Sequence, residues 1–263
     1  MSRKALFFDI DGTLLTEGSK NLPSSAVKAI EAARQAGHLV FINSGRARCL
    51  MREIEDSLPV DGFLCGCGTY IEIQGRAALH HLIGRARRME LQRCILSHNL
   101  EGVLEGMGNC FMHTRKPRME EMERLKEVFF QNDILRYTDW NKEAASFDKF
   151  CVLADQYSNI KGFLKELGND MAPIDRGHGL YECVPAGFDK ASAMKFTLDY
   201  FHIPWEESYA FGDSTNDLAM IRYACNSVIM GKHDRELEPY ASFITKNVED
   251  DGIAYALEAL SII

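Results

Sequence analysis

The sequence has no long apolar run, no paired cysteine motif and no excess of positive charge. No segment approaches the run of about 20 apolar residues that a membrane-spanning helix needs. The apolar stretch after the first four residues is interrupted by Asp9 and Asp11, so it differs from the core of a signal peptide. We therefore expect a cytoplasmic protein without a membrane partner.

The eight cysteines show no pattern typical of a metal centre or of a disulfide framework. Only Cys65 and Cys67 are close together, and no matching pair or histidine cluster completes a zinc site. We expect reduced cysteines that lie mostly in the core, as is usual in the cytosol.

The charge balance is acidic. The chain has 38 acidic and 30 basic residues, which gives a formal net charge of -8. A surface of this sign repels phosphate backbones, so we expect no nucleic acid partner. A small anion can still bind where positive charge is concentrated locally.

The composition is that of an ordinary globular chain. Hydrophobic residues make up 46% and charged residues 26% of the sequence, which excludes a disordered, collagen-like or coiled-coil protein. A length of 263 residues favours two domains over one.

The first part of the chain alternates between short apolar runs and helical patterns. The runs lie at residues 5–8, 39–42 and 60–64, and Gly37 ends the helix between the first two. This β-α-β-α-β order is typical of a parallel sheet with helices on its faces. Residues 70–81 then predict a hairpin that turns at Gln74-Gly75.

The middle of the chain has a different pattern. Apolar positions at helical spacing occur at residues 122–129 and 160–167, and strand-like runs occur at 147–153, 171–174 and 180–184. This segment is interpreted as a separate α+β unit.

The first pattern returns from residue 188 onward. We expect a helix at about 190–201 and short strands at 208–211, 227–230 and 243–245. The predicted fold is therefore a doubly wound α/β core formed by residues 1–82 and 185–263. An α+β domain of residues 83–184 is inserted into it.

Polar side chains follow several of the predicted strands. In open α/β sheets, ligands bind at the carboxyl ends of the strands, so these side chains are expected to gather at one edge. They are Asp9, Asp11 and Thr13 after the first strand, Ser44, Gly45 and Arg46 after the second, Lys190 at a helix start, and Asp213, Asn216 and Asp217 after the strand at 208–211.

This set of groups suits phosphoryl transfer. Oxygen ligands from Asp9, Asp213 and a main-chain carbonyl near Asp11 would hold a hard divalent cation. Ser44 and Lys190 would bind the remaining phosphate oxygens. One carboxylate can then attack phosphorus and form an aspartyl phosphate, with positioning and charge neutralisation supplying most of the catalysis.

Taken singly, each residue also has a structural explanation. Ser44 is compatible with a helix cap, Lys190 with a solvated surface lysine, and Asp213 and Asp217 with a solvated helix face. A calcium-binding EF-hand does not fit the first acidic loop, because Gly12 comes too early and no glutamate follows at the required distance. The joint order of the motifs favours the functional interpretation.

These motifs resemble those of the haloacid dehalogenase superfamily. Asp9-Ile10-Asp11-Gly12-Thr13-Leu14 resembles the first motif, D-x-D-G-T-L, and 212–217 resembles the fourth, G-D-x-x-N-D. Ser44 and Lys190 resemble the second and third. A large α/β cap between the second and third motifs, with Met230-Gly231 and the segment 251–253 near the end, is similar to the Cof-type sugar-phosphatase branch.

The resemblance implies a role for each acidic residue. Asp9 would be the nucleophile. Asp11 would be the general acid and then the general base, and its main-chain carbonyl would bind Mg²⁺. Asp213 would be a metal ligand, and Asp217 would support the metal shell or orient Lys190.

The resemblance also implies which residues hold the phosphate. Ser44 and Lys190 would bind the transferring phosphoryl group, and Thr13 would orient the first loop. The remaining substrate- or phosphate-binding candidates are Gly45, Arg46 and Asn216. The chain departs from the family in two places, with Ser44 where threonine is commoner and Cys67-Gly68-Thr69 where the branch usually has N-G-A.

The sequence therefore predicts a Mg²⁺-dependent phosphatase that acts on a small phosphate ester, with a sugar phosphate as the expected substrate. Two alternatives stay open, a phosphomutase and an inactive binding or regulatory protein on the same scaffold. Whether the chain is a monomer or a homodimer stays open as well. In the cap, the loop from Arg115 to Arg118 is our first candidate for substrate contact.

Overall fold

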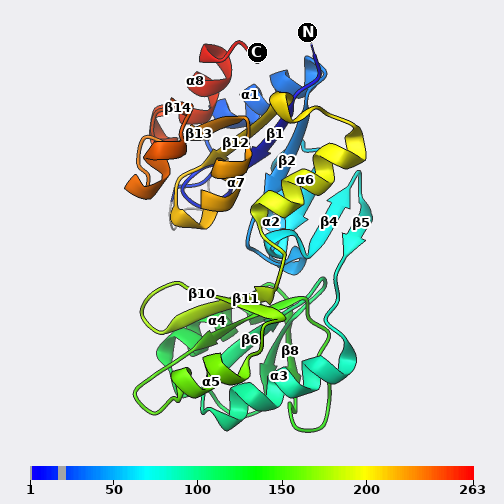
Figure 1. The fold of residues 1–263 in the computed structure, drawn as a ribbon, viewed down its shortest axis with the longest axis vertical. Coiled ribbons are helices and arrows are strands. Elements are labelled where there is room, and N and C mark those ends of the chain that lie inside the picture. Colours follow the sequence, from blue (N-terminus) through cyan, green and yellow to red (C-terminus); the bar gives the residue numbers. More distant parts are fainter. Residues whose placement is uncertain (1, 17–21) are drawn as a thin grey trace. The chain divides into compact units, whose positions relative to one another are not determined.

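The structure is a computed structural model that describes residues 2–16 and 22–263. The chain separates into two compact units (Figure 1). Unit 1 comprises Met1–Arg46, Met51–Leu79 and Asp189–Ile263, and unit 2 comprises Ala47–Leu50 and His80–Phe188. The predicted domain boundaries after residues 82 and 184 stay a proposal. The sequence did not predict that Ala47–Leu50 belongs with unit 2.

Unit 1 is built on an eight-stranded sheet with the order β14-β13-β12-β1-β2-β3-β4-β5. Neighbouring strands from β14 to β3 are parallel, and β4 is antiparallel to β3. The strands are β1 (Ala5–Phe8), β2 (Leu39–Asn43), β3 (Gly62–Cys65), β4 (Tyr70–Ile73), β5 (Arg76–His80), β12 (Ser208–Gly212), β13 (Asn226–Ile229) and β14 (Phe243–Ile244). The strand order reverses at β1, which is where doubly wound sheets bind ligands.

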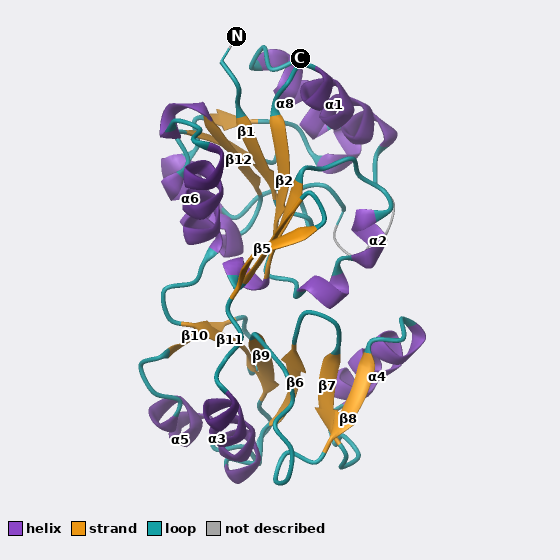
Figure 2. Cartoon of the chain, turned by 90° about the vertical axis from the view of Figure 1, so that its right-hand side faces the viewer, coloured by secondary structure: helices purple, strands orange, loops and turns teal. Residues whose placement is uncertain are grey.

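Helices cover both faces of this sheet (Figure 2). Leu6 and Phe8 of β1 pack in the cluster that contains α1, α2 and α8, whereas Ala5 and Phe7 pack in the cluster that contains α6 and α7. A strand that is buried on both faces needs an unbroken apolar run, which β1 has. The helices are α1 (Ser24–Gln35), α2 (Arg52–Glu55), α6 (Lys190–Phe201), α7 (Leu218–Tyr223) and α8 (Gly252–Ala259). The predicted doubly wound core is confirmed.

Unit 2 is a mixed α+β structure, as predicted. Its sheet has the order β10-β11-β9-β6-β7-β8, and all pairs are antiparallel except β7 with β8. The apolar residues of α3 and α5 pack in one cluster, and those of α4 pack in another. The elements are α3 (Arg85–Ser97), β6 (Glu101–Glu105), β7 (Cys110–His113), α4 (Glu120–Gln131), β8 (Leu135–Thr138), β9 (Lys149–Leu153), α5 (Ile160–Glu166), β10 (Met171–Asp175) and β11 (Leu180–Pro185).

Candidate active site

The loop after β1 places Asp9 at the carboxyl end of the sheet. The Asp9 main-chain N–H donates to the Phe211 carbonyl at 3.0 Å, which continues the pairing with β12. Gly12 turns the loop with φ of +86°, and a Cβ atom at this position would lie 2.1 Å from Oδ2 of Asp213. Glycine is needed here because both the backbone conformation and the close approach exclude a side chain.

Lys190 lies at the start of α6 and joins two carboxylates. Its Nζ atom is 2.6 Å from Oδ1 of Asp9 and 2.6 Å from Oδ1 of Asp217, and its side chain is only 1% exposed. Asp189 caps the helix through the Ser192 N–H. Asn43, at the end of β2, donates from Nδ2 to the Lys190 carbonyl at 2.9 Å. The Asp189 helix cap and the hydrogen bond from Asn43 hold the backbone of Lys190 in place at the carboxyl end of the sheet.

The loop after β12 supplies Asp213 and Asp217. The Thr13 hydroxyl donates to Oδ1 of Asp213 at 3.0 Å, so Thr13 links the first loop to this carboxylate. Oδ2 of Asp217 accepts the main-chain N–H of Asp213 at 2.9 Å and that of Ser214 at 3.3 Å. Since its other oxygen accepts from Lys190, Asp217 already has a partner for each oxygen. Asn216 lies in the same turn, between Thr215 and Asp217.

The site holds more negative than positive charge. Carboxylate oxygens of Asp9, Asp213 and Asp217 all lie within 4.8 Å of one another. Burial raises the pKa of Asp9 to about 7, with a further increase from Asp217 and opposition from Lys190. Burial raises the pKa of Asp213 to about 8, and Asp217 and Asp9 add to this. Burial alone would lower the pKa of Lys190, but Asp217 and Asp9 outweigh it and raise that pKa.

A divalent cation fits this deficit of positive charge. The donors are carboxylate oxygens, which hard cations such as Mg²⁺ prefer. One lysine cannot balance three carboxylates, and the raised pKa values show how costly their ionisation is without a further cation. Asp9, Asp213 and Asp217 are therefore consistent with a metal site.

Asp11 and Arg46 form a pair at the rim of the site. Nε and Nη2 of Arg46 lie 3.0 and 2.5 Å from the two carboxylate oxygens of Asp11. The Asp11 side chain is half exposed, unlike Asp9. Ser44 is buried, and its Oγ accepts the Arg46 main-chain N–H at 3.2 Å. The structure thus brings Ser44, Gly45 and Arg46 to the same edge as Asp11, but the sequence did not predict the Asp11–Arg46 pair.

A cleft of about 430 Å³ opens beside this edge, within the size range of small-molecule sites. Residues of the acidic loops line it together with Lys232, His233 and Asp234, which sequence reasoning missed. Asp234 is bound to the fourth motif, because its main-chain N–H donates to the Asp213 carbonyl at 2.8 Å and its carboxylate accepts the Thr215 N–H at 2.7 Å. The sequence feature that could have identified Lys232, His233 and Asp234 is their position just after the strand predicted at 227–230.

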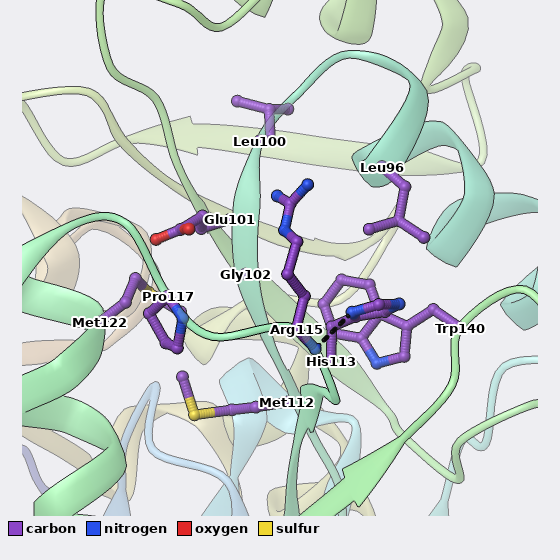
Figure 3. Close-up of a pocket in the computed structure, with 10 residues that line it drawn as sticks. All are labelled: Leu96, Leu100, Glu101, Gly102, Met112, His113, Arg115, Pro117, Met122 and Trp140. Atoms are coloured by element: carbon purple, nitrogen blue, oxygen red, sulfur yellow. Dashed lines mark hydrogen bonds between the residues drawn. The ribbon is translucent and has the colours of Figure 1, made fainter.

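The candidate substrate loop of unit 2 is partly bound within that unit. Figure 3 shows Arg115 beside His113, whose Nδ1 accepts the Arg115 main-chain N–H at 2.9 Å. The cavity that they line measures about 30 Å³, which is room for about one water and not for a sugar. Arg118 pairs with Asp155 and donates to Asn99. Substrate contact by this loop stays a prediction.

No helix in residues 2–16 and 22–263 combines the length and the apolar character of a membrane span.

The chain is similar to known proteins over its whole length. A family model described as haloacid dehalogenase-like hydrolase matches residues 6–257. The Bacillus subtilis protein YkrA is 30% identical over 100% of both chains. A second B. subtilis protein, 5-amino-6-(5-phospho-D-ribitylamino)uracil phosphatase YwtE, is 25% identical over 98% of both chains.

Solved structures show the same fold. The HAD subclass IIB sugar phosphatase BT4131 superposes with a TM-score of 0.83 at 23% identity, and the match covers 99% of this chain and 100% of that one. The chain therefore belongs to the haloacid dehalogenase-like hydrolase family, as a phosphatase whose fold includes a separate mixed cap sheet.

Proposed function

We propose that this chain hydrolyses the phosphate monoester of a sugar or sugar alcohol, with Mg²⁺ and through an aspartyl phosphate at Asp9. The observation that carries the proposal is the Asp9 carboxylate, which Lys190 holds at 2.6 Å beside Asp213 and Asp217. Two relatives support the substrate class, since one is named for a phosphoribityl compound and the other for a sugar phosphate. The proposed location is the cytoplasm, without nucleic acid or membrane partners.

In the first step, a carboxylate oxygen of Asp9 attacks phosphorus and the ester P–O bond breaks. Asp11 gives its proton to the leaving alkoxide. Ser44 and Lys190 bind the phosphoryl oxygens, and Lys190 offsets their charge. Held by Asp9, Asp213 and the Asp11 carbonyl, Mg²⁺ would neutralise further charge on the phosphate.

In the second step, water attacks the phosphorus of the aspartyl phosphate and Asp11 accepts its proton. The bond between phosphorus and Asp9 breaks, inorganic phosphate leaves, and the Asp9 carboxylate is restored. Arg46 engages both oxygens of Asp11 in the structure, so Asp11 can act on substrate only after it leaves that pair.

The Asp11→Asn variant is expected to lose activity in a way that depends on the leaving group. Asparagine keeps the main-chain carbonyl but cannot donate a proton, so hydrolysis of a sugar phosphate should slow on the order of 10² to 10⁴. The loss should be much smaller for p-nitrophenyl phosphate, whose leaving group needs little protonation. Steady-state rates on both substrates test this, and equal losses would argue against Asp11 as the acid.

A phosphomutase is the main alternative activity. A mutase must return the phosphoryl group to sugar before water takes it, so it needs a bisphosphate activator and releases little phosphate. Against an inactive scaffold, Asp9, Asp11 and Asp213 are all present.

A screen for released phosphate tests the proposal directly. The substrates are hexose and pentose phosphates, sugar-alcohol phosphates, nucleotides and a folded phosphoprotein, each with Mg²⁺ and with a chelator. We expect Mg²⁺-dependent release from a small sugar or sugar-alcohol phosphate, without an activator. Efficient release from the phosphoprotein, without preference among small esters, would contradict the proposal.

A further inference from the structure

Unit 2 contains a cluster of metal-ligating side chains that the phosphatase reaction does not use. Cys94 lies in the last turns of α3, and His98 follows four positions later at the C-terminal cap of that helix. Residues four positions apart lie on the same face of a helix. Glu166 ends α5 and reaches the same place, so that ligand atoms of all three residues lie within 4.8 Å of one another.

Hydrogen bonds hold both the ring and the backbone of His98 in place. Its ring Nε2 lies 2.7 Å from Oε2 of Glu166. Its main-chain N–H donates to the Cys94 carbonyl at 3.2 Å, and its own carbonyl accepts the Asn159 N–H at 2.9 Å. The first bond lies within the end of α3, and the second connects that end to the start of α5.

Gly162 makes room for the imidazole ring. A Cβ atom at this position would lie 2.3 Å from Nδ2 of Asn159, the N-cap of α5, and 2.7 Å from Cε1 of His98, and both are closer than real contacts allow. Glycine is unfavourable inside a helix, and Gly162 lies within α5. The Asn159 cap and the His98 ring together leave no room for a side chain at this position.

The donor set differs from that of unit 1. Sulfur, nitrogen and oxygen together suit Zn²⁺, which binds cysteine, histidine and carboxylate in tetrahedral sites, often with a water in the fourth position. The cluster in unit 1 offers only carboxylate oxygens and suits Mg²⁺. The thiol is a poor ligand for Mg²⁺, so the two sites should separate hard from softer cations.

The cluster is also accessible from one side. Cys94 is buried and the His98 side chain is 13% exposed, whereas the Glu166 side chain is 62% exposed. A cation can therefore enter past Glu166. Ligand atoms around a tetrahedral Zn²⁺ lie roughly 3.5 Å apart, whereas Nε2 of His98 and Oε2 of Glu166 are 2.7 Å apart, so a bound ion requires Glu166 to move away from His98 by roughly 1 Å, which an exposed side chain can do.

We propose that Cys94, His98 and Glu166 form a binding site for a borderline-soft divalent cation of the Zn²⁺ class, which ties α3 to α5. The site uses none of the residues proposed for phosphoryl transfer. All three side chains contribute to binding in this proposal, so replacement of any one of them should weaken the binding of the cation.

The test is a Co²⁺ titration of the whole, reduced, metal-free protein in the presence of excess Mg²⁺. Cobalt bound to a thiolate shows a sulfur-to-metal charge-transfer band that oxygen ligands do not produce. We expect this band to saturate at one Co²⁺ per chain and to disappear when Zn²⁺ is added. Absence of the band at millimolar Co²⁺ would overturn the proposal, and would leave an ordinary His98–Glu166 hydrogen bond beside a buried thiol.

Variants assign the band to these residues. Cys94→Ser should abolish it, and His98→Gln and Glu166→Gln should each raise the apparent Kd for Co²⁺ at least about tenfold, since even outer-shell partners contribute this much. Glu166 is exposed, so its variant should fold normally. Cys225→Ser is the matched control, because Cys225 lies in unit 1, and it should leave the band unchanged. A band that survives Cys94→Ser would also overturn the proposal.

Discussion

Replacement of Asp9 by asparagine is expected to abolish phosphate release while the fold is kept. The amide has nearly the same shape and its oxygen can still accept from Lys190, which lies 2.6 Å from Oδ1 of Asp9. It cannot attack phosphorus, and it is a poorer ligand for Mg²⁺. Loss of a covalent nucleophile should lower kcat at least about a thousandfold.

The stability of this variant separates a catalytic from a structural defect. The folded-state pKa of Asp9 is raised to about 7, above its ordinary value, so ionised Asp9 destabilises the metal-free fold at pH 8. Asp9→Asn should therefore unfold in urea at an equal or higher midpoint than the parent at pH 8 without Mg²⁺. Asp199→Asn, at an exposed pair with Lys195, is the matched control and should keep full activity. Activity of Asp9→Asn within tenfold of the parent would place the nucleophile elsewhere.

The core of unit 1 was predictable because its strands are buried on both faces. Such strands need uninterrupted apolar runs, and the run at residues 5–8 coincides with β1. Asp9 and Lys190 became candidates because polar residues follow directly on such runs or open the next helix. These are local signals, which a single sequence carries.

The distances between these residues were not predictable in the same way, although the motif resemblance already implied that Asp217 could orient Lys190. Lys190 is 181 positions from Asp9, and its distances to Asp9 and Asp217 depend on the register of β1 against β12. The pair of Asp11 with Arg46 depends on the direction of two side chains at a rim. Neither register nor side-chain direction is encoded in spacing along the chain.

The cluster in unit 2 shows the same limit. The spacing of cysteines and histidines along the chain does not identify Cys94 and His98 as a candidate site, because their third partner, Glu166, is 68 positions from His98. Only the packing of α3 beside α5 brings the three together. The assignment of Ala47–Leu50 to unit 2 has a similar origin, since Cys49 meets Cys110 with their sulfur atoms 3.6 Å apart.

Replacement of Lys190 by methionine is expected to damage both stability and catalysis. Methionine fills a similar volume but leaves Asp9 and Asp217 buried without their cation. Breaking a buried ion pair in this way should lower the free energy of unfolding by about 3–5 kcal/mol without Mg²⁺. Loss of a positive charge next to a transferring phosphoryl group should lower kcat by about 10³- to 10⁵-fold.

The stability loss of Lys190→Met should depend on pH, and the sign follows from the carboxylates. Burial already raises the pKa of Asp9, and loss of the lysine charge that opposes this should raise it further. The folded variant then binds more protons than the unfolded chain, so its stability falls as pH rises. In urea unfolding, the free energy of unfolding should fall further below that of the parent at pH 8 than at pH 5.5, and Mg²⁺ should restore part of the loss.

Lys195→Met, at an exposed position of the same helix, is the matched control and should change neither the stability nor the activity. A Lys190→Met protein as stable as the parent at pH 8 without Mg²⁺ would show that the lysine does not balance these buried charges.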